Sequence, residues 1–217
     1  MKRKIICSIF ILILLFSISC KKESVTNTNG VILTYAGNVL INSKAAKRGT
    51  IIKFGDVITT QANSSCEIIV AEKNIFRLGA NSKMIFNISK TQNSIDLKKG
   101  WLSGVSKKKF TSQGEFFVNT PTAVAGVRGT AFCLKIESPK KTYFCVCNGV
   151  INLKTSNNDQ RETISAAHHA ARRYIRDDDG NIRVDTNQTL DYHTDKTLEK
   201  LAKKINVTID WTAPDRN

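Results

Sequence analysis

The chain lacks the short motifs that usually mark an enzyme. It has no Gly-x-Ser-x-Gly turn, no His-Glu-x-x-His pair, no phosphate-binding loop and no glycine fingerprint for a dinucleotide. Histidine is scarce as well, because only His168, His169 and His193 are present, and none of them accompanies a recognisable nucleophile. We therefore expect a protein that binds a ligand or a partner and does not catalyse a reaction.

Long apolar runs are absent except near the N-terminus. The run Ile5–Ile18 is nearly unbroken, but it is shorter than the roughly 20 residues that span a bilayer. A basic segment precedes it and small residues follow, which is typical of a secretory signal over residues 1–19. The small residue before Cys20 predicts cleavage at that point and acylation of Cys20. The alternatives are ordinary secretion with cleavage near Ser19 and without acylation, or an apolar run that stays uncleaved as an anchor.

The residue three positions before Cys20 is Ser17, where lipidation signals usually have Leu. Looser signals of this kind resemble those of spirochaete lipoproteins. The resemblance implies a lipid-anchored protein of the cell envelope that faces the periplasm or resides in the outer membrane. Several acyl chains would hold such a protein on the membrane without help from its fold.

Acidic residues are few. The chain has 18 Asp and Glu against 33 Lys and Arg, and its formal net charge is +15. A basic protein attracts polyanions. Because export removes nucleic acid from the expected partners, the candidates are anionic lipid head groups, acidic glycans or an envelope protein. The alternative is that the lysines only form a solvated surface.

Short β-rich runs dominate residues 31–155. Gly, Asn, Ser and Asp interrupt them about every 8–12 residues, which is typical of an all-β sandwich, barrel or solenoid. The run from Phe132 to Ile136 alternates between apolar and other residues, so one face of it should be buried. The sequence thus predicts a mainly β domain over 31–155.

The flanking segments differ in character. Residues 20–30 are polar and without periodicity, which predicts a tether between lipid and domain. Residues 156–217 form a C-terminal extension with polar loops. Within it, the spacing of Leu190, Leu198, Leu201 and Ile205 predicts a helix over about 189–206.

A resemblance to a known family rests mainly on residues 120–132, which read TPTAVAGVRGTAF. This segment is similar to the Thr-Pro-x-Ala-x-x-x-Val-Arg-Gly-Thr-x-Phe signature of FecR domains. The Gly55-to-Thr60 turn and the segment from Val146 to Val150 resemble further family elements. We interpret the signature positions as structural, and they are Thr120, Pro121, Val127, Arg128, Gly129, Thr130 and Phe132.

The resemblance implies a fold and a setting. The implied fold is a right-handed β-solenoid of stacked short strands, and the predicted C-terminal helix would pack on it and cap it. In the family's best-known setting the domain lies in the periplasm and reports the state of a receptor to an anti-sigma segment in the cytoplasm. Only four residues precede the apolar run here, so we expect any signalling to need a second protein.

The cysteines after Cys20 are Cys66, Cys133, Cys145 and Cys147. If Phe132 and Val146 pair on neighbouring strands with their side chains inward, Cys133 faces Cys145 on the opposite face. A Cys133–Cys145 disulfide is then one interpretation.

A metal site is the second interpretation. Cys145 and Cys147 lie on one strand face, and His168 and His169 follow about 20 residues later. Two thiolates with one or two imidazoles suit Zn²⁺ or Cu⁺, and the same residues suit a haem. FecR domains typically lack these cysteines and histidines, so the set is where a function of this chain is expected. The third interpretation is that the thiols stay unpaired.

Three functions follow from these patterns. The first is an envelope lipoprotein whose FecR-like domain binds a ligand or a partner protein. The second is the periplasmic component of a FecR-type signalling system, and the third is metal or haem handling through the Cys and His residues.

Overall fold

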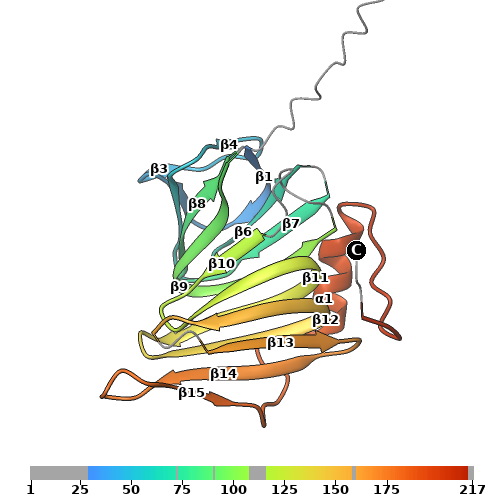
Figure 1. Ribbon diagram of the computed structural model, residues 1–217. Coiled ribbons are helices and arrows are strands. Elements are labelled where there is room, and N and C mark those ends of the chain that lie inside the picture. The colour runs from blue at the N-terminus through green and yellow to red at the C-terminus, as the bar shows by residue number, and fades with distance from the viewer. Residues whose placement is uncertain (1–28, 72, 90, 108–115, 158–159, 215–217) are drawn as a thin grey trace, which may run out of the picture.

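The computed structural model describes residues 29–71, 73–89, 91–107, 116–157 and 160–214 (Figure 1). The predicted leader 1–19, Cys20 and the predicted tether up to residue 28 lie outside the described residues, and Gly30 already belongs to the first strand. Among the helices of the described part, none combines the length and the hydrophobicity that crossing a bilayer requires.

The described chain is mainly β, as the sequence predicts, and carries one helix near its C-terminus. The elements in chain order are β1 (Gly30–Ala36), β2 (Val39–Ile41), β3 (Lys44–Ala45), β4 (Ile51–Ile52), β5 (Asp56–Thr60), β6 (Ser65–Val70), β7 (Asn74–Leu78), β8 (Lys83–Ile88), β9 (Asn93–Ser106), β10 (Phe116–Asn119), β11 (Ala123–Ser138), β12 (Lys141–Thr155), β13 (Arg161–Ala166), β14 (Ala170–Arg176), β15 (Ile182–Asp185) and α1 (Asp195–Lys203).

The strand pairing differs from the solenoid that the family resemblance implied. The strands form one sheet, ordered β15-β14-β12-β11-β10-β9-β7-β6-β1-β4 with β2, β3, β5, β8 and β13 attached beside this path. Among the described strands only β9 and β10 pair in parallel, whereas the coils of a solenoid stack parallel strands. The sheet instead curls into a closed five-strand barrel that carries the further strands.

Two long strands change partners along their length. The first half of β9 pairs with β8 and its second half with β7 and β11. Likewise β12 pairs with β14 over Lys141–Val146 and with β13 over Gly149–Lys154. Gly149 lies at this bend with a φ of 122°, and a Cβ there would come within 2.7 Å of the Gly129 carbonyl oxygen. Glycine is therefore required where β11 and β12 approach each other.

The pairing of β11 with β12 follows the prediction. Phe132 lies opposite Val146, and Cys133 lies opposite Cys145. Phe132 and Val146 belong to the main apolar core. The cysteines point to the other face of the sheet, where they join a second apolar cluster.

The second cluster exists because the C-terminal extension covers this face. From the sheet it takes Ile75, Val105, Ala131, Cys133, Tyr143, Cys145, Cys147 and Ala171, and from the extension Leu198, Leu201, Ala202, Ile205 and Ile209. The helix α1 thus packs on the sheet, as predicted, although it covers a face instead of capping an end (Figure 1).

The extension also contains more regular structure than expected. Strands β13, β14 and β15 continue the sheet beyond residue 155, so the predicted boundary at that residue is not a boundary of the sheet. The helix is shorter than the predicted 189–206. It begins after Thr194, whose hydroxyl accepts from the Thr197 amide while the Thr197 hydroxyl accepts from the Thr194 amide. This reciprocal capping fixes the first turn.

Candidate metal centre

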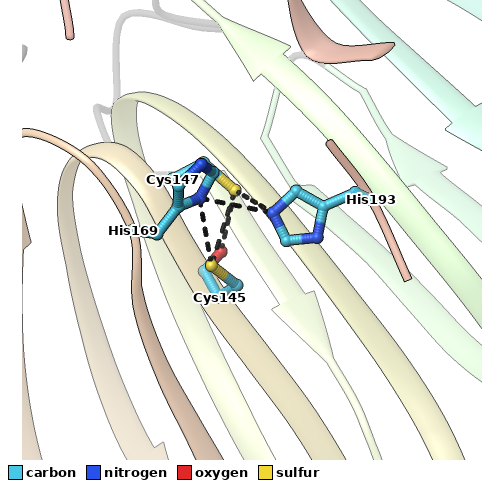
Figure 2. Close-up of side chains that lie close together, drawn as sticks. All are labelled: Cys145, Cys147, His169 and His193. Atoms are coloured by element: carbon cyan, nitrogen blue, oxygen red, sulfur yellow. Dashed lines mark hydrogen bonds between the residues drawn. The ribbon is translucent and has the colours of Figure 1, made fainter. Parts of the chain in front are cut away.

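Four side chains from three separate parts of the chain converge on the covered face of the sheet. Cys145 and Cys147 come from β12, His169 from the turn between β13 and β14, and His193 from the segment just before α1 (Figure 2). One ligand-type atom from each lies within 4.8 Å of the others, and both cysteines are buried.

Local structure explains this convergence. The alternation along β12 places Cys145 and Cys147 on the same face. Immediately afterwards β12 bends at Gly149, so β13 and β14 separate and their connecting turn comes to lie beside Cys147. His169 sits in this turn with a φ of 54°, and its amide donates to the Cys147 carbonyl oxygen at 3.0 Å.

Four of the six distances between the ligand atoms are close to the edges of a tetrahedron around a metal ion. The two sulfurs lie 3.7 Å apart, Cys145 Sγ lies 3.5 Å from His169 Nδ1, and Cys147 Sγ lies 3.1 Å from His193 Nε2. The nitrogens His169 Nδ1 and His193 Nε2 lie 3.4 Å apart. A tetrahedral zinc ion with ordinary bond lengths requires edges of about 3.8 Å between sulfurs, about 3.5 Å between sulfur and nitrogen, and about 3.3 Å between nitrogens. The four distances therefore match such an ion to within about 0.4 Å, and the other two are no longer than 4.8 Å.

Both imidazoles have an outer partner that orients them. His169 donates from Nε2 to Asp195 Oδ1 at 2.6 Å, and His193 donates from Nδ1 to the Asp191 carbonyl oxygen at 2.8 Å. With these hydrogens assigned from the partners, each ring turns the lone pair of its other nitrogen toward the cysteines. Metal-binding histidines in proteins usually have outer partners of this kind.

The two thiols differ in their electrostatics. The hydrogen bond from Cys147 lowers the pKa of Cys145 to about 4; burial opposes this, and hydrogen bonds to His169 and His193 add to it. Burial raises the pKa of Cys147, and the neighbouring Cys145 adds to this shift. Cys145 is therefore the more acidic of the two thiols, and a metal ion bound here would require both sulfurs as thiolates.

Three of the four residues predicted for a metal site come together, namely Cys145, Cys147 and His169. His168 lies outside the quartet: its side chain is half exposed, and its Nε2 lies 2.9 Å from Asp195 Oδ2. His193 was missed. The only signal for it in the sequence is that it completes the chain's small set of histidines.

The remaining cysteines are free thiols in the described structure. Cys133 is buried directly opposite Cys145, as the predicted pairing requires, but no bond joins them. Cys66 lies in the main core, far from the quartet in the sheet order, beside Leu78 on β7.

The signature residues lie around β11. The Thr120 hydroxyl donates to the Ala123 carbonyl oxygen at 2.7 Å, and the Thr130 hydroxyl donates to the Val150 carbonyl oxygen at 2.9 Å. Val127 and Phe132 are buried. Pro121 precedes the strand, Gly129 adopts a φ of 56°, and the backbone of Arg128 pairs with Val150. Apart from the partly buried Pro121, those of these side chains that the structure describes are buried or bonded to neighbouring backbone.

The comparison with protein families settles the identity of this region. The model of the FecR protein family matches residues 56–152. These residues form a FecR domain.

Other comparisons add little. No curated protein matches the chain. Two crystal structures of a candidate anti-sigma factor from Parabacteroides distasonis ATCC 8503 resemble it with 15% sequence identity and a TM-score of 0.46. The likeness covers 60% of this chain and 59% of that protein.

The quartet straddles the end of the FecR domain. Cys145 and Cys147 lie inside the matched residues, whereas His169 and His193 lie beyond them. The domain therefore contributes both sulfurs, and the C-terminal extension contributes both nitrogens.

Proposed function

We propose that this protein is a FecR-domain regulatory component of the cell envelope that binds one zinc-class metal ion through Cys145, Cys147, His169 and His193. The close approach of these four ligand atoms, all within 4.8 Å of one another, carries the proposal. A set of two sulfurs and two nitrogens in this geometry favours Zn²⁺. Cu⁺ is the other ion that such ligands suit.

The ion is structural in this proposal. Four protein ligands complete a tetrahedron, which leaves no position for water or substrate, and closed sites of this kind stabilise folds. The ion would join β12 to the turn before β14 and to the segment before α1. Its role would be to hold the extension against the sheet.

The surroundings of the quartet support this role. The buried side chain of Asn148 donates to the carbonyl oxygens of Asp210 and Ala213 at 2.7 and 2.9 Å. The Asp191 amide donates to the Tyr143 hydroxyl at 3.2 Å. These bonds tie the extension to β12 on both sides of the quartet, so a bound ion would lie at the centre of an extensive junction.

The regulatory part of the proposal rests on the FecR domain. Members of this family act in regulation and face the periplasm, which supports binding of a partner protein in preference to catalysis. We propose that the chain reaches this compartment through the leader 1–19 and is held at the membrane by acylated Cys20. Any signal would then pass to a second protein.

Metal analysis of the purified protein tests the central claim. Wild-type protein, loaded with Zn²⁺ under reducing conditions and freed of excess ion, should contain about one ion per chain. Cys147→Ser and His193→Ala should each lose it. Cys133→Ser is the matched control, because this thiol is equally buried on the same sheet face but stands outside the quartet. Equal zinc in all four proteins contradicts the proposal. If the wild type retains Cu⁺ but not Zn²⁺, the site is assigned to Cu⁺.

A further inference from the structure

One end of the molecule combines exposed cations with exposed apolar side chains. We call it the basic end, and it lies within residues 44–54. Its exposed charged and large apolar residues are Lys44, Lys47, Arg48, Ile51, Lys53 and Phe54. It consists of β3, β4 and the turns around them; β4 pairs with β1 and β3 with β2, and both lie at the same end of the molecule in Figure 1.

The positive charge of this surface is compensated only in part. No acidic residue occurs between Glu23 and Asp56 in the sequence. Within the described part of the chain, none of the four cations forms an ion pair with another residue. Asp56 itself accepts from the Asn42 side chain and from the Lys53 amide, both at 2.7 Å. Four exposed cations thus stand against one carboxylate, that of Asp56, which leaves this surface with a net positive charge.

The apolar members are unusual for a solvated surface. Ile51 is 54% exposed and Phe54 is 53% exposed, which makes them the most exposed large apolar side chains of the described residues. Ile51 points outward because its neighbour Ile52 is fully buried on the other face. An apolar hollow of about 320 Å³ is lined in part by Val31, the pairing partner of Ile51, and by Leu33 and Arg48. Cations around protruding apolar groups are typical of surfaces that bind the membrane interface.

The position of the basic end also points to a membrane. Strand β4 pairs with the first residues of β1, Gly30 with Ile52 and Val31 with Ile51. Cys20 lies ten residues before Gly30, and a chain of that length spans at most about 35 Å. An anchor at Cys20 would therefore keep this end of the domain close to the lipid head groups.

We infer that the basic end docks on the anionic head groups of the membrane that holds the chain, with Ile51 and Phe54 entering the interface. The inference rests on the proposed acylation of Cys20 and is independent of the metal site. Each basic residue near an anionic surface strengthens such docking about fivefold. The apolar pair adds a contribution that salt does not screen.

Hydrogen exchange on vesicles tests this inference. Full-length protein, purified from its own membrane, is reconstituted into neutral phosphatidylcholine vesicles and into vesicles that also contain anionic phosphatidylglycerol. The amides of residues 44–54 should exchange more slowly on the anionic vesicles only. Replacing Lys47→Glu and Arg48→Glu together should weaken docking at least about 25-fold and abolish the difference. Replacing Lys200→Glu and Lys203→Glu on the exposed face of α1 is the matched control, and it should leave the difference in exchange between the two vesicle types intact.

The outcomes separate the two proposals. Protein that floats with the vesicles but exchanges equally on both compositions overturns the docking and leaves the anchor standing. Intact mass without acyl chains, together with failure to float, overturns the anchor and this inference with it. Protection by an acidic polysaccharide but not by anionic vesicles overturns the inference in favour of a glycan partner.

Discussion

The carboxylate of Asp195 offers the sharpest test of the metal centre, because it does not touch the ion itself. It accepts from His169 at 2.6 Å and lies 2.9 Å from His168 Nε2. It is also the first residue of α1. Changing Asp195→Asn removes the negative charge that makes His169 a stronger ligand and keeps the size of the side chain.

The magnitude follows from these contacts. Loss of an outer partner of a ligand typically costs about 10–100-fold in metal affinity, which corresponds to about 1.4–2.7 kcal/mol of stability when the ion is saturating. A chain of this size loses about 2–4 °C of melting temperature per kcal/mol. The zinc-loaded variant should therefore melt about 3–10 °C below the wild type.

The metal-free protein provides the internal comparison. Without an ion the substitution removes a favourable charge at a helix N-terminus, which contributes about 0.3–1 kcal/mol, and it removes the same charge from the contacts with His168 and His169. Thermal melts of the wild type and the variant, each with zinc and with a chelator, give the loss of melting temperature in the loaded and in the metal-free state. Competition with a chromophoric chelator gives the zinc affinity directly. Asp178→Asn is the matched control, because its carboxylate is 98% exposed. Equal melting losses with and without zinc, at unchanged affinity, would refute the reasoning.

Three further predictions concern the fold. Burial raises the pKa of Glu137, but hydrogen bonds from Arg173, Tyr192 and Lys141 outweigh it and lower this pKa to about 2. The ionised carboxylate therefore stabilises the fold above pH about 4.5, and this stabilisation is lost as the pH falls to about 2. In Glu137→Gln, the free energy of urea unfolding should decline less over that pH range, by up to about 2–3 kcal/mol. Leu201→Ala should cost about 2–5 kcal/mol in urea unfolding of the zinc-loaded protein, since this side chain is buried between α1 and the sheet; a cost below 1 kcal/mol would mean that the helix does not belong to the cooperative unit. Gly79→Ala should cost at least about 1–3 kcal/mol, because a Cβ there overlaps the Trp101 ring, and an unchanged melting temperature would contradict that packing.

Alternation and pairing were accessible from the sequence because they depend on neighbouring residues. The period of two around Phe132 and Val146 placed Cys133, Cys145 and Cys147 on one face, and the short connection between the strands fixed their register. The same reasoning located two of the four ligands, and His169 was predicted only because it follows them by about 20 residues.

The missing ligand had no such local signal. His193 lies on an irregular segment 24 residues after His169, and only the docking of α1 on the sheet brings it to Cys147. The helix start was missed for a related reason. The expected capping pattern has Glu or Gln three residues after the cap, whereas this chain uses Thr197. Strand β14 escaped notice because arginines separate its two buried residues, Ala171 and Tyr174.

The order of residues from His193 to Asp195 links metal binding to the docking of the extension. A ligand, a helix cap and an outer partner of a second ligand occur in three consecutive positions. A helix of nine residues has little stability by itself, so its first turn depends on what fixes these three residues. An ion that fixes His193 also aligns Asp195 with His169 and starts the helix whose Leu198 and Leu201 cover the second apolar cluster. Loss of the ion should therefore loosen residues 193–205 before it loosens the strands. Hydrogen exchange of the zinc-loaded and chelator-treated protein measures this, and equal protection of α1 in both states would mean that the apolar contacts alone hold the extension in place.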